Sequence, residues 1–297
     1  MRLVGTAVLE IELEEAGPRD GRPVLLLHGW PDAPRGWRPV AARLHQRGWR
    51  TLTPALRGSG KTQFRSSDTL RDGRGVALAA DAIDLLDALR LERVPVVGHD
   101  WGARAAYILA AIAPERVIAI VALGLGYQPR GVFRMPPFVQ ARSFWYQWLM
   151  YVDAGALAVA ADPIGFARIQ WDTWSPPGWF GEDEFHVTAH SFTNPDWVAI
   201  TLHAYRSRFR ADEPCDERYE PFASRLATVE RIAIPTVIIQ GAEDSCDRPC
   251  ASANLERYFT RGYERVVLQG VGHFPHREEP EAVARIIDRH LQATWSG

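Results

Sequence analysis

The most informative segment of the chain reads Val94-Pro95-Val96-Val97-Gly98-His99-Asp100-Trp101-Gly102-Ala103-Arg104. Its short apolar run predicts a buried strand, and the alanine-rich pattern that follows predicts a helix. Gly98 and Gly102 flank a tight turn between the two, because small residues let the backbone adopt a strained conformation. The segment therefore predicts a strand, a sharp turn and a helix, with the side chain of Asp100 at the tip of the turn.

The spacing of Gly98, Asp100 and Gly102 matches the G-x-S-x-G turn of serine hydrolases, with aspartate in place of serine. A carboxylate has a reference pKa near ~3.9, so it is ionised at neutral pH and needs no base to become a nucleophile. Such a carboxylate can displace a leaving group at a saturated carbon, which leaves an alkyl ester on the enzyme. We therefore expect epoxide opening or dehalogenation, followed by ester hydrolysis. An aspartate after a strand can also be an ordinary helix N-cap, so the rest of the chain has to separate the two interpretations.

The composition fits an ordinary globular enzyme of one large domain, or a domain with an insertion, because 46% of the 297 residues are hydrophobic and 24% are charged. The formal net charge of −2 argues against a nucleic-acid or membrane-surface partner.

Cys215, Cys246 and Cys250 are too few for a disulfide framework and lack the spacing of zinc ligands. No segment is typical of a signal peptide or a membrane span. We expect a cytoplasmic protein with reduced thiols and no bound metal.

Apolar runs alternate with amphipathic stretches over the first part of the chain and again near its end. Continuous apolar strands of this kind are typical of a parallel sheet that is covered on both faces. The expected strands cover 8–14, 24–27, 50–53, 94–98, 117–123, 234–241 and 265–268, and the expected helices lie around 40–44 and over 76–91, 105–113, 251–259 and 279–291.

The alternation stops between about residue 128 and about residue 222. This part contains two Pro-Pro pairs and six of the eleven tryptophans of the chain. An aromatic-rich helical insertion between two strands predicts a cap over an apolar pocket. We therefore expect a core in two parts, 1–127 and 223–297, with a helical cap over 128–222. The six tryptophans of this insertion are Trp145, Trp148, Trp171, Trp174, Trp179 and Trp197.

Four motifs, in this order, resemble the epoxide hydrolase and dehalogenase branch of the α/β-hydrolase family. They are His28-Gly29-Trp30-Pro31, Gly98-His99-Asp100-Trp101-Gly102, Gly241-Ala242-Glu243-Asp244 and Gly272-His273-Phe274. The resemblance covers nearly the whole chain. It implies an α/β-hydrolase fold with a mostly parallel eight-stranded sheet, helices on both faces and a helical cap inserted after strand 6. It also implies a reaction without a cofactor.

The resemblance assigns a role to each motif. Asp100 attacks carbon, and the backbone N–H groups of Trp30 and Trp101 form the oxyanion hole for the later ester cleavage. His273 activates the water that attacks the ester, since an ionised aspartate needs no base. Asp244 orients His273 and stabilises its imidazolium, and Asp247 is the alternative for this acid.

Two tyrosines of the insertion resemble the ring-opening acids of epoxide hydrolases. Tyr146 lies in Phe144-Trp145-Tyr146-Gln147, and Tyr205 lies in His203-Ala204-Tyr205-Arg206. A phenol with a reference pKa near ~10 stays protonated at pH 7 and can donate its proton to an alkoxide. Tyr127 and Tyr151 lie close enough in the sequence to compete for the first role.

A dehalogenase is the main alternative, because indole N–H groups can hold a halide ion. Trp101 would suit this role together with Trp148 or Trp171. A haloacid substrate is disfavoured. Haloacid dehalogenases of this family carry two arginines on the helix after the nucleophile. Only Arg104 matches this pattern, because Trp101 replaces the other arginine. A ligand-binding protein without activity is a further alternative, although such proteins often lose nucleophile, acid or base.

We predict an epoxide hydrolase that forms a vicinal diol through an alkyl ester on Asp100. The aromatic insertion suggests a substrate with an apolar or aromatic body, contacted by Pro31, Trp101 and Trp148. The expected partner is this small molecule alone, without nucleic acid or membrane, and the expected assembly is a monomer or a homodimer.

Overall fold

A mostly parallel sheet forms the centre of this computed structural model, which describes residues 1–210 and 212–295. Its strands run in the order β1-β2-β4-β3-β6-β7-β8-β9, and β5 pairs with β2. The pairs of β2 with β1, β4 and β5 are antiparallel, and the others are parallel. The strands are β1 (Arg2–Gly5), β2 (Leu9–Ala16), β3 (Arg22–Leu27), β4 (Trp49–Pro54), β5 (Gln63–Phe64), β6 (Val94–His99), β7 (Val117–Leu123), β8 (Thr236–Gly241) and β9 (Tyr263–Leu268).

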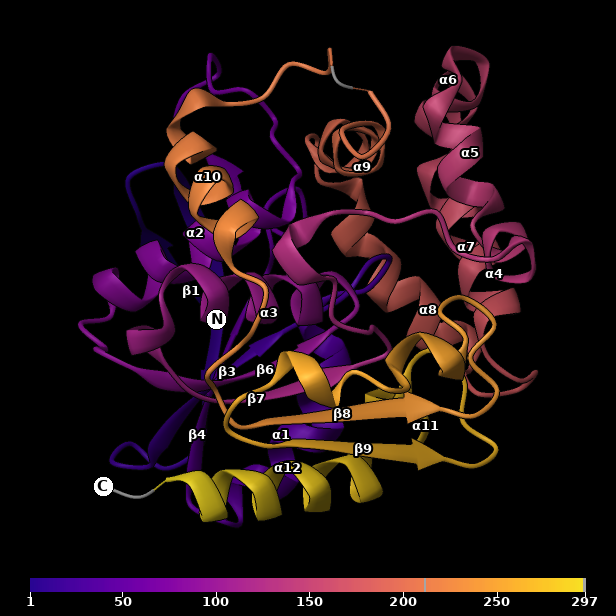
Figure 1. Cartoon of the computed structure of the whole chain (residues 1–297). Helices are drawn as coiled ribbons and strands as arrows, with labels where there is room; N and C mark the ends of the chain where they lie inside the picture. The colour runs from indigo at the N-terminus through magenta and orange to yellow at the C-terminus, as the bar shows by residue number, and fades with distance from the viewer. Residues whose placement is uncertain (211, 296–297) are drawn as a thin grey trace.

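Helices cover both faces of the sheet, as the sequence predicts (Figure 1). Helices α1 and α12 pack against each other on one face, and α2 packs against α3 on the other. The continuous path contains eight strands, and the two residues of β5 add a ninth that is too short to leave a pattern in the sequence. The helices of the core are α1 (Arg38–His45), α2 (Gly75–Ala88), α3 (Trp101–Ile112), α10 (Glu220–Thr228), α11 (Pro275–Glu278) and α12 (Pro280–Thr294).

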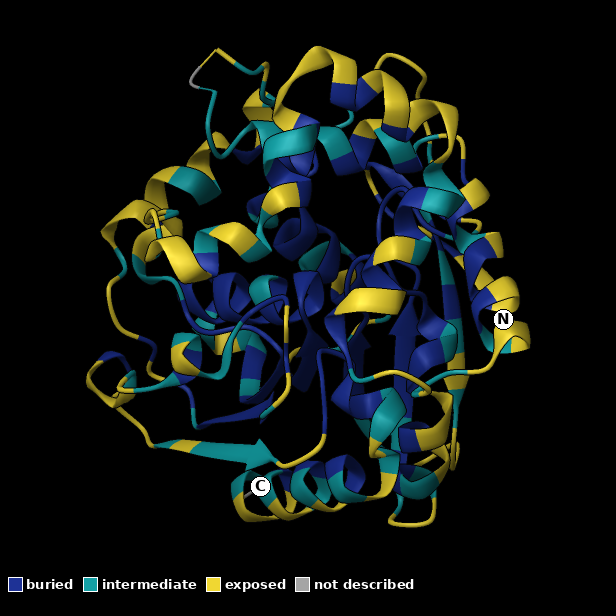
Figure 2. Ribbon diagram, turned by 90° about the vertical axis from the view of Figure 1, so that its right-hand side faces the viewer, coloured by how far each residue is buried: buried dark blue, intermediate teal, exposed yellow. Residues whose placement is uncertain are grey.

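Two apolar cores explain why the central strands are apolar at every position. In β3, Leu25 and Leu27 face the core shared with α2 and α3, whereas Val24 and Leu26 face the core shared with α1 and α12. All four side chains are buried, because successive residues of a strand point to opposite faces. Figure 2 shows these inner strands as buried and the outer sides of the helices as exposed.

In the described residues, six helices between β7 and β8 lie wholly within the expected insertion, and α10 (Glu220–Thr228) crosses its end. Figure 1 shows α4, α5, α7 and α8 on the side toward which β8 and β9 point, at the carboxyl ends of the parallel strands. Residue 211 of the expected cap and residues 296 and 297 of the expected second core part lie outside the described residues. The six helices are α4 (Phe138–Ser143), α5 (Trp145–Tyr151), α6 (Asp153–Ala161), α7 (Pro163–Trp174), α8 (Glu182–Ala189) and α9 (Trp197–Arg206).

The helix expected over Ala251–Phe259 is not formed, and this prediction is wrong. Two short 3-10 turns take its place, because Asn254 adopts a φ of 59° that a right-handed helix does not allow. None of the helices described for this chain combines the length and the apolar character that a membrane crossing requires. The 3-10 turns of the chain are η1 (Pro34–Trp37), η2 (Pro114–Arg116), η3 (Pro129–Gly131), η4 (His190–Thr193), η5 (Glu217–Tyr219), η6 (Pro249–Ser252) and η7 (Glu256–Tyr258).

Candidate active site

Asp100 lies at the turn between β6 and α3, with a φ of 48° and a ψ of −108°. Close packing requires glycine on both sides of this residue. A Cβ atom on Gly98 would collide with the carbonyl oxygen of Gly102, and one on Gly102 would collide with that of Leu27. Asp100 makes no side-chain N-cap bond. The strained turn therefore presents the carboxylate to the loops beyond the sheet, rather than to the helix that follows.

The loop after β3 supplies a hydrogen-bond donor to this carboxylate. The backbone N–H of Trp30 donates to Oδ1 of Asp100 at 3.0 Å. Trp101 is the first residue of α3, so its N–H has no acceptor within the helix. Gly29 must be glycine here, because a Cβ atom would come within 2.5 Å of Nδ1 of His99 and 2.8 Å of Cβ of Asp100. Of the two expected oxyanion donors, the N–H of Trp30 thus contacts the Asp100 carboxylate, and Trp101 directly follows Asp100 in the chain.

His273 lies in the loop after β9 and faces Asp100. Its Nε2 is 3.8 Å from Oδ2 of Asp100, and its Nδ1 is 2.9 Å from Oδ2 of Asp244. Three further donors hold the Asp244 carboxylate: Nε2 of Gln240 at 2.9 Å and the backbone N–H groups of Cys246 and Asp247 at 2.8 Å and 2.9 Å. This set of contacts fixes Asp244, and through it the ring of His273.

Burial and charge act in opposite directions on these groups. Burial alone would lower the pKa of His273, but the nearby carboxylates, above all Asp244, raise it to about 9. Burial raises the pKa of Asp247 to about 7. The Asp247 carboxylate accepts a hydrogen bond from the N–H of Gly126 and none from His273. Of the two acids proposed from the sequence, Asp244 is therefore the one hydrogen-bonded to the histidine.

Tyr146 and Tyr205 lie beside Asp100 with their rings nearly perpendicular, at an angle of 88° and a centroid distance of 5.4 Å. Each phenol oxygen is held by an N–H donor. The Tyr205 oxygen accepts from the indole of Trp101 at 3.1 Å, and the Tyr146 oxygen accepts from the amide of Gln147 at 3.0 Å. Burial raises the pKa of both phenols well above the usual value, so both are protonated at neutral pH.

The competing tyrosines lie elsewhere. The Tyr127 hydroxyl donates to the carbonyl oxygen of Glu230, and Tyr151 is exposed. Neither lines the chamber that contains Asp100.

Two of the expected substrate contacts also lie outside this chamber. The indole N–H of Trp148 donates to the carbonyl oxygen of Ala141, and Trp148 lines neither the chamber nor the larger cavity beside it. Pro31 is buried, and its carbonyl oxygen accepts from the indole of Trp171. Neither residue lines either space, and their role as substrate contacts stays a prediction.

The chamber at Asp100 is small, with a volume of about 20 Å³, and a cavity of about 390 Å³ adjoins it. The two share five lining residues, so these side chains form their common boundary. Arg208, Gln147 and Cys246 line the chamber, and the sequence did not single them out as site residues. The spacing of Tyr205 and Arg208 could have indicated that both lie on one face of a helical turn. The five shared residues are Arg104, Leu125, Gln128, Phe133 and Arg208.

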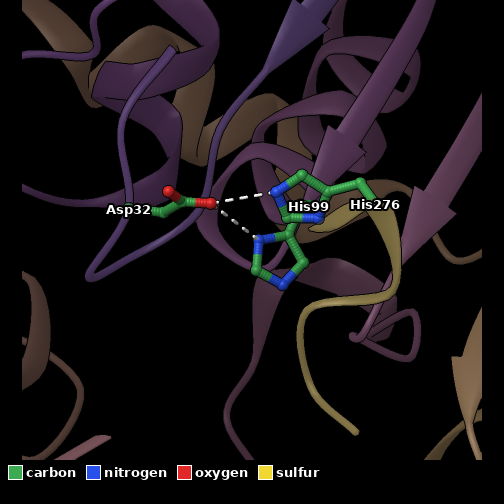
Figure 3. Close-up of side chains that lie close together, drawn as sticks. All are labelled: Asp32, His99 and His276. Carbon is green, nitrogen blue, oxygen red and sulfur yellow. Dashed lines mark hydrogen bonds and ion pairs between the residues drawn. The ribbon is translucent and has the colours of Figure 1, made fainter. Parts of the chain in front are cut away.

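Asp32, His99 and His276 form a buried cluster next to the turn (Figure 3). Oδ2 of Asp32 lies 2.9 Å from Nε2 of His276 and 4.0 Å from Nδ1 of His99. Although burial acts in the opposite direction, Arg277 and the His276 hydrogen bond hold the pKa of Asp32 well below its usual range. A metal ion at this cluster would face the guanidinium of Arg277, which already donates to both carboxylate oxygens of Asp32. We therefore interpret the cluster as structural support for the turn.

The orientation of His99 agrees with this interpretation. Burial lowers the pKa of His99 well below its usual value, so the ring is neutral. Its Nε2 donates to the backbone carbonyl oxygen of His273 at 2.8 Å. The residue before the nucleophile is thus tied to the backbone of the expected base.

A second group with metal-ligand chemistry, Asp72, His203 and Cys215, lies away from the turn. Arg74 makes hydrogen bonds with both carboxylate oxygens of Asp72, and the N–H of Gly73 donates to Nδ1 of His203. These donors already use the atoms of Asp72 and His203 that a metal ion would need.

The parallel sheet, the carboxylate at its sharpest turn and the histidine paired with an aspartate define a hydrolase of the α/β class with an aspartate at the nucleophile position. The sequence profile of the alpha/beta hydrolase fold matches residues 22–280. The chain belongs to this family and, within it, to the epoxide hydrolases.

Relatives and solved structures support this assignment. An epoxide hydrolase of Caballeronia sordidicola is 32% identical, over 97% of this chain and 92% of the relative. Epoxide hydrolase A of Mycobacterium tuberculosis is 25% identical, over 97% and 96% of the two chains. A crystal structure from Klebsiella pneumoniae, provisionally assigned as an epoxide hydrolase, is 36% identical with a TM-score of 0.91 and covers 98% of this chain and 97% of its own.

Proposed function

We propose that this chain hydrolyses an epoxide to a vicinal diol through a covalent alkyl ester on Asp100. One observation carries the proposal. An aspartate at the tip of a strained turn lies 3.8 Å from the free nitrogen of a histidine, and two protonated phenols line the same chamber. A carboxylate and two acids are what the opening of a strained ether ring requires, because one group attacks carbon while another neutralises the alkoxide.

In the first step, a carboxylate oxygen of Asp100 forms a bond to one epoxide carbon, and the bond from that carbon to the ring oxygen breaks. Tyr146 and Tyr205 act as acids toward the ring oxygen. Each phenol oxygen accepts an N–H and keeps its own proton, and the Tyr146 hydroxyl also lies 3.6 Å from the Cys246 thiol, where either group can donate. This step yields a hydroxyalkyl ester and one phenolate.

The phenolate regains its proton from the protonated His273. A buried phenolate is unfavourable, as the raised pKa values of both tyrosines indicate, and a His273 pKa of about 9 supports an imidazolium at neutral pH before the reaction. Loss of that proton leaves a neutral imidazole. His273 is then ready to act as a base.

In the second step, neutral His273 takes a proton from water, and the resulting hydroxide attacks the ester carbonyl carbon. Nε2 of His273 has no protein partner within hydrogen-bond distance in the described part of the chain, which supports this role. The N–H groups of Trp30 and Trp101 would stabilise the oxyanion, and one such donor is typically worth ~10²–10³ in rate. Collapse of the intermediate breaks the bond between the acyl carbon and the alkyl oxygen. The imidazolium protonates the departing diol, and the Asp100 carboxyl group loses its proton to His273.

The three indoles that the sequence offers to a dehalogenase already have acceptors. The N–H groups of Trp101, Trp148 and Trp171 donate to Tyr205, Ala141 and Pro31, respectively. A halide ion could bind one of these indoles only if the existing hydrogen bond broke. The two phenols, in contrast, can donate a proton to an alkoxide. The ligand-binding alternative is disfavoured because nucleophile, base and acid are all retained.

The finer expectations about organisation are proposals as well. We propose that residues 128–222 act as a cap, that the protein is cytoplasmic and that it is a monomer or a homodimer. The aromatic side chains of the insertion support an apolar or aromatic substrate body, since Trp30 stacks with Tyr146 and Trp197 at centroid distances of 5.8 Å and 5.9 Å.

The test is trapping of the ester. A His273→Gln variant incubated with styrene oxide should gain the whole mass of the epoxide on the peptide that contains Asp100, as measured by mass spectrometry. His190→Gln, at an exposed position, is the matched control and should turn over without an adduct. With the unmodified enzyme, one turnover in oxygen-18 water should label the Asp100 carboxylate. Label in the diol alone after a single turnover would refute the covalent route.

A further inference from the structure

Two arginines, Arg104 and Arg208, lie where the chamber of Asp100 meets the larger cavity, and both line both spaces. Arg104 extends from α3, one helical turn after the nucleophile, and Arg208 follows the end of α9. Elements far apart in the sequence thus bring two guanidinium groups to the same boundary. The proposed epoxide chemistry does not use either of them.

Neither guanidinium has a carboxylate partner within ion-pair distance among residues 1–210 and 212–295. Arg104 donates to the amide oxygen of Gln128 at 3.1 Å, and Arg208 donates to that of Gln147 at 3.2 Å. The other two arginines of the larger cavity are paired. Arg74 contacts Asp72 at 2.7 Å and Glu220 at 2.9 Å, and Arg130 contacts Glu230 at 3.2 Å. These last three acids do not line the cavity.

The electrostatics of the boundary are unfavourable for two cations. No Asp or Glu lines the larger cavity. Nε of Arg104 is buried without a hydrogen-bond partner. Burial, and then repulsion from Arg208, lower the pKa of Arg104 to about 10. An anion between the two side chains would relieve this repulsion and supply the missing acceptors.

We propose that the substrate is an epoxide that also carries a carboxylate, and that Arg104 and Arg208 bind this carboxylate while Asp100 attacks the ring. The inference rests on the proposed function and narrows its substrate class. We choose a monoanion because Arg104 and Arg208 have no carboxylate partner of their own, while Asp100 and Asp247 already line the chamber. A carboxylate also matches the planar, bidentate geometry of a guanidinium group.

A purely structural role for Arg208 is the competing explanation. Its bond to Gln147 continues to the phenol of Tyr146, so loss of Arg208 could disturb the ring-opening acid. This effect would act on charged and neutral epoxides alike. The ratio of kcat/KM for a carboxylate substrate to that for its methyl ester therefore isolates the binding of charge.

The experiment compares para-carboxystyrene oxide with its methyl ester, and a terminal epoxyhexanoate with its methyl ester. We expect the unmodified enzyme to prefer the carboxylate by about 10- to 100-fold in kcat/KM, the range of hydrogen bonds to charged groups. In Arg104→Gln and Arg208→Gln this ratio should approach one. Arg130→Gln removes a paired arginine of the same cavity and should keep the ratio.

A measurement on the unmodified enzyme guards against variants that do not fold. The unreactive para-ethylbenzoate should inhibit hydrolysis of a neutral epoxide at least about tenfold more strongly than para-ethylbenzamide. If the unmodified enzyme opens the epoxide of the methyl esters and of the carboxylates with equal kcat/KM, this proposal is overturned and the epoxide hydrolase function remains intact. No turnover of any epoxide would instead contradict the proposed function. A higher kcat/KM for an epoxybutyl phosphate than for the carboxylates would overturn the choice of a monoanion.

Discussion

Removal of the negative charge of Asp100 is expected to lower the pKa of His273. The two groups are 3.8 Å apart, and the charge of Asp100 is one of the causes that raise this pKa to about 9. At this distance a pair of unit charges interacts by about 4 kcal/mol at an effective dielectric constant near 20, and by about 1 kcal/mol in water. Since one pKa unit corresponds to about 1.4 kcal/mol, the expected decrease is about one to three units.

Alkylation of Asp100 removes the same charge. The sign of the effect favours the reaction, because the pKa of His273 falls from about 9 toward ~6–8 once the ester has formed. The histidine therefore tends to be protonated before attack and neutral when a base is needed. The rate of ester breakdown should rise with pH through this lowered pKa and then level off.

Two measurements check this prediction. The pKa of His273 can be followed by imidazole nuclear magnetic resonance in the unmodified enzyme and in Asp100→Asn, with mass spectrometry to verify that the amide persists. Asp172→Asn, at a surface ion pair with Arg168, is the control. Stopped-flow tryptophan fluorescence can follow ester breakdown in single turnovers, since Trp174 contacts His273 at a centroid distance of 4.8 Å. An unchanged pKa in Asp100→Asn, or ester breakdown that is half-maximal near pH 9, would refute the reasoning.

Three further predictions concern the acids, the buried carboxyl and the oxyanion loop. Tyr146→Phe and Tyr205→Phe should each slow epoxide opening by roughly 10²-fold or more, because each variant loses a general acid. Rapid-quench measurement of the rate of Asp100 alkylation checks this, and an unchanged rate would exclude that phenol from the mechanism. Asp247 has a pKa raised to about 7, so its ionisation destabilises the fold as pH rises from about 4 to about 7. The difference in unfolding free energy in favour of Asp247→Asn should thus grow by roughly 2–3 kcal/mol between pH 5 and pH 8 in denaturant titrations, and a constant difference would contradict the raised pKa. Gly29→Ala should lower kcat by ~10²-fold, because the new methyl group would collide with His99 and Asp100. Gly181→Ala is the control and should leave kcat unchanged, because its methyl group meets open space. Equal kcat values in the two variants would argue against a rigid loop.

Much of the core was predictable because its signals are local. The apolar run before Asp100 and the two glycines around it specify a strand and a turn whatever the rest of the chain does. Continuous burial on both faces explains why β3 and β7 appear as uninterrupted apolar runs. The alternation of these strands with helices predicts a mainly parallel sheet, whereas the order of its strands comes from the structure.

Other features depend on contacts that the sequence does not encode locally. Trp148 is an aromatic residue of the kind that lines apolar pockets. Its indole N–H nevertheless donates to the carbonyl oxygen of Ala141, and its ring packs on Phe209 at a centroid distance of 4.9 Å. Arg208 lines the chamber together with Arg104 of α3, from which it is far apart in the sequence. The stretch after Pro249 contains good helix formers, but the positive φ of Asn254 interrupts them. In each case tertiary packing overrides a local preference.

Trp30 joins two parts of the molecule. Its backbone N–H donates to Asp100, and its indole N–H donates to Oγ1 of Thr201 on α9 at 2.9 Å. A chimera that receives the inserted helices of a relative would therefore also receive a new neighbour for this indole. Engineers who exchange that segment to alter selectivity need to exchange position 30 together with α9, because a displaced Trp30 would also move the N–H that contacts Asp100, the proposed oxyanion donor.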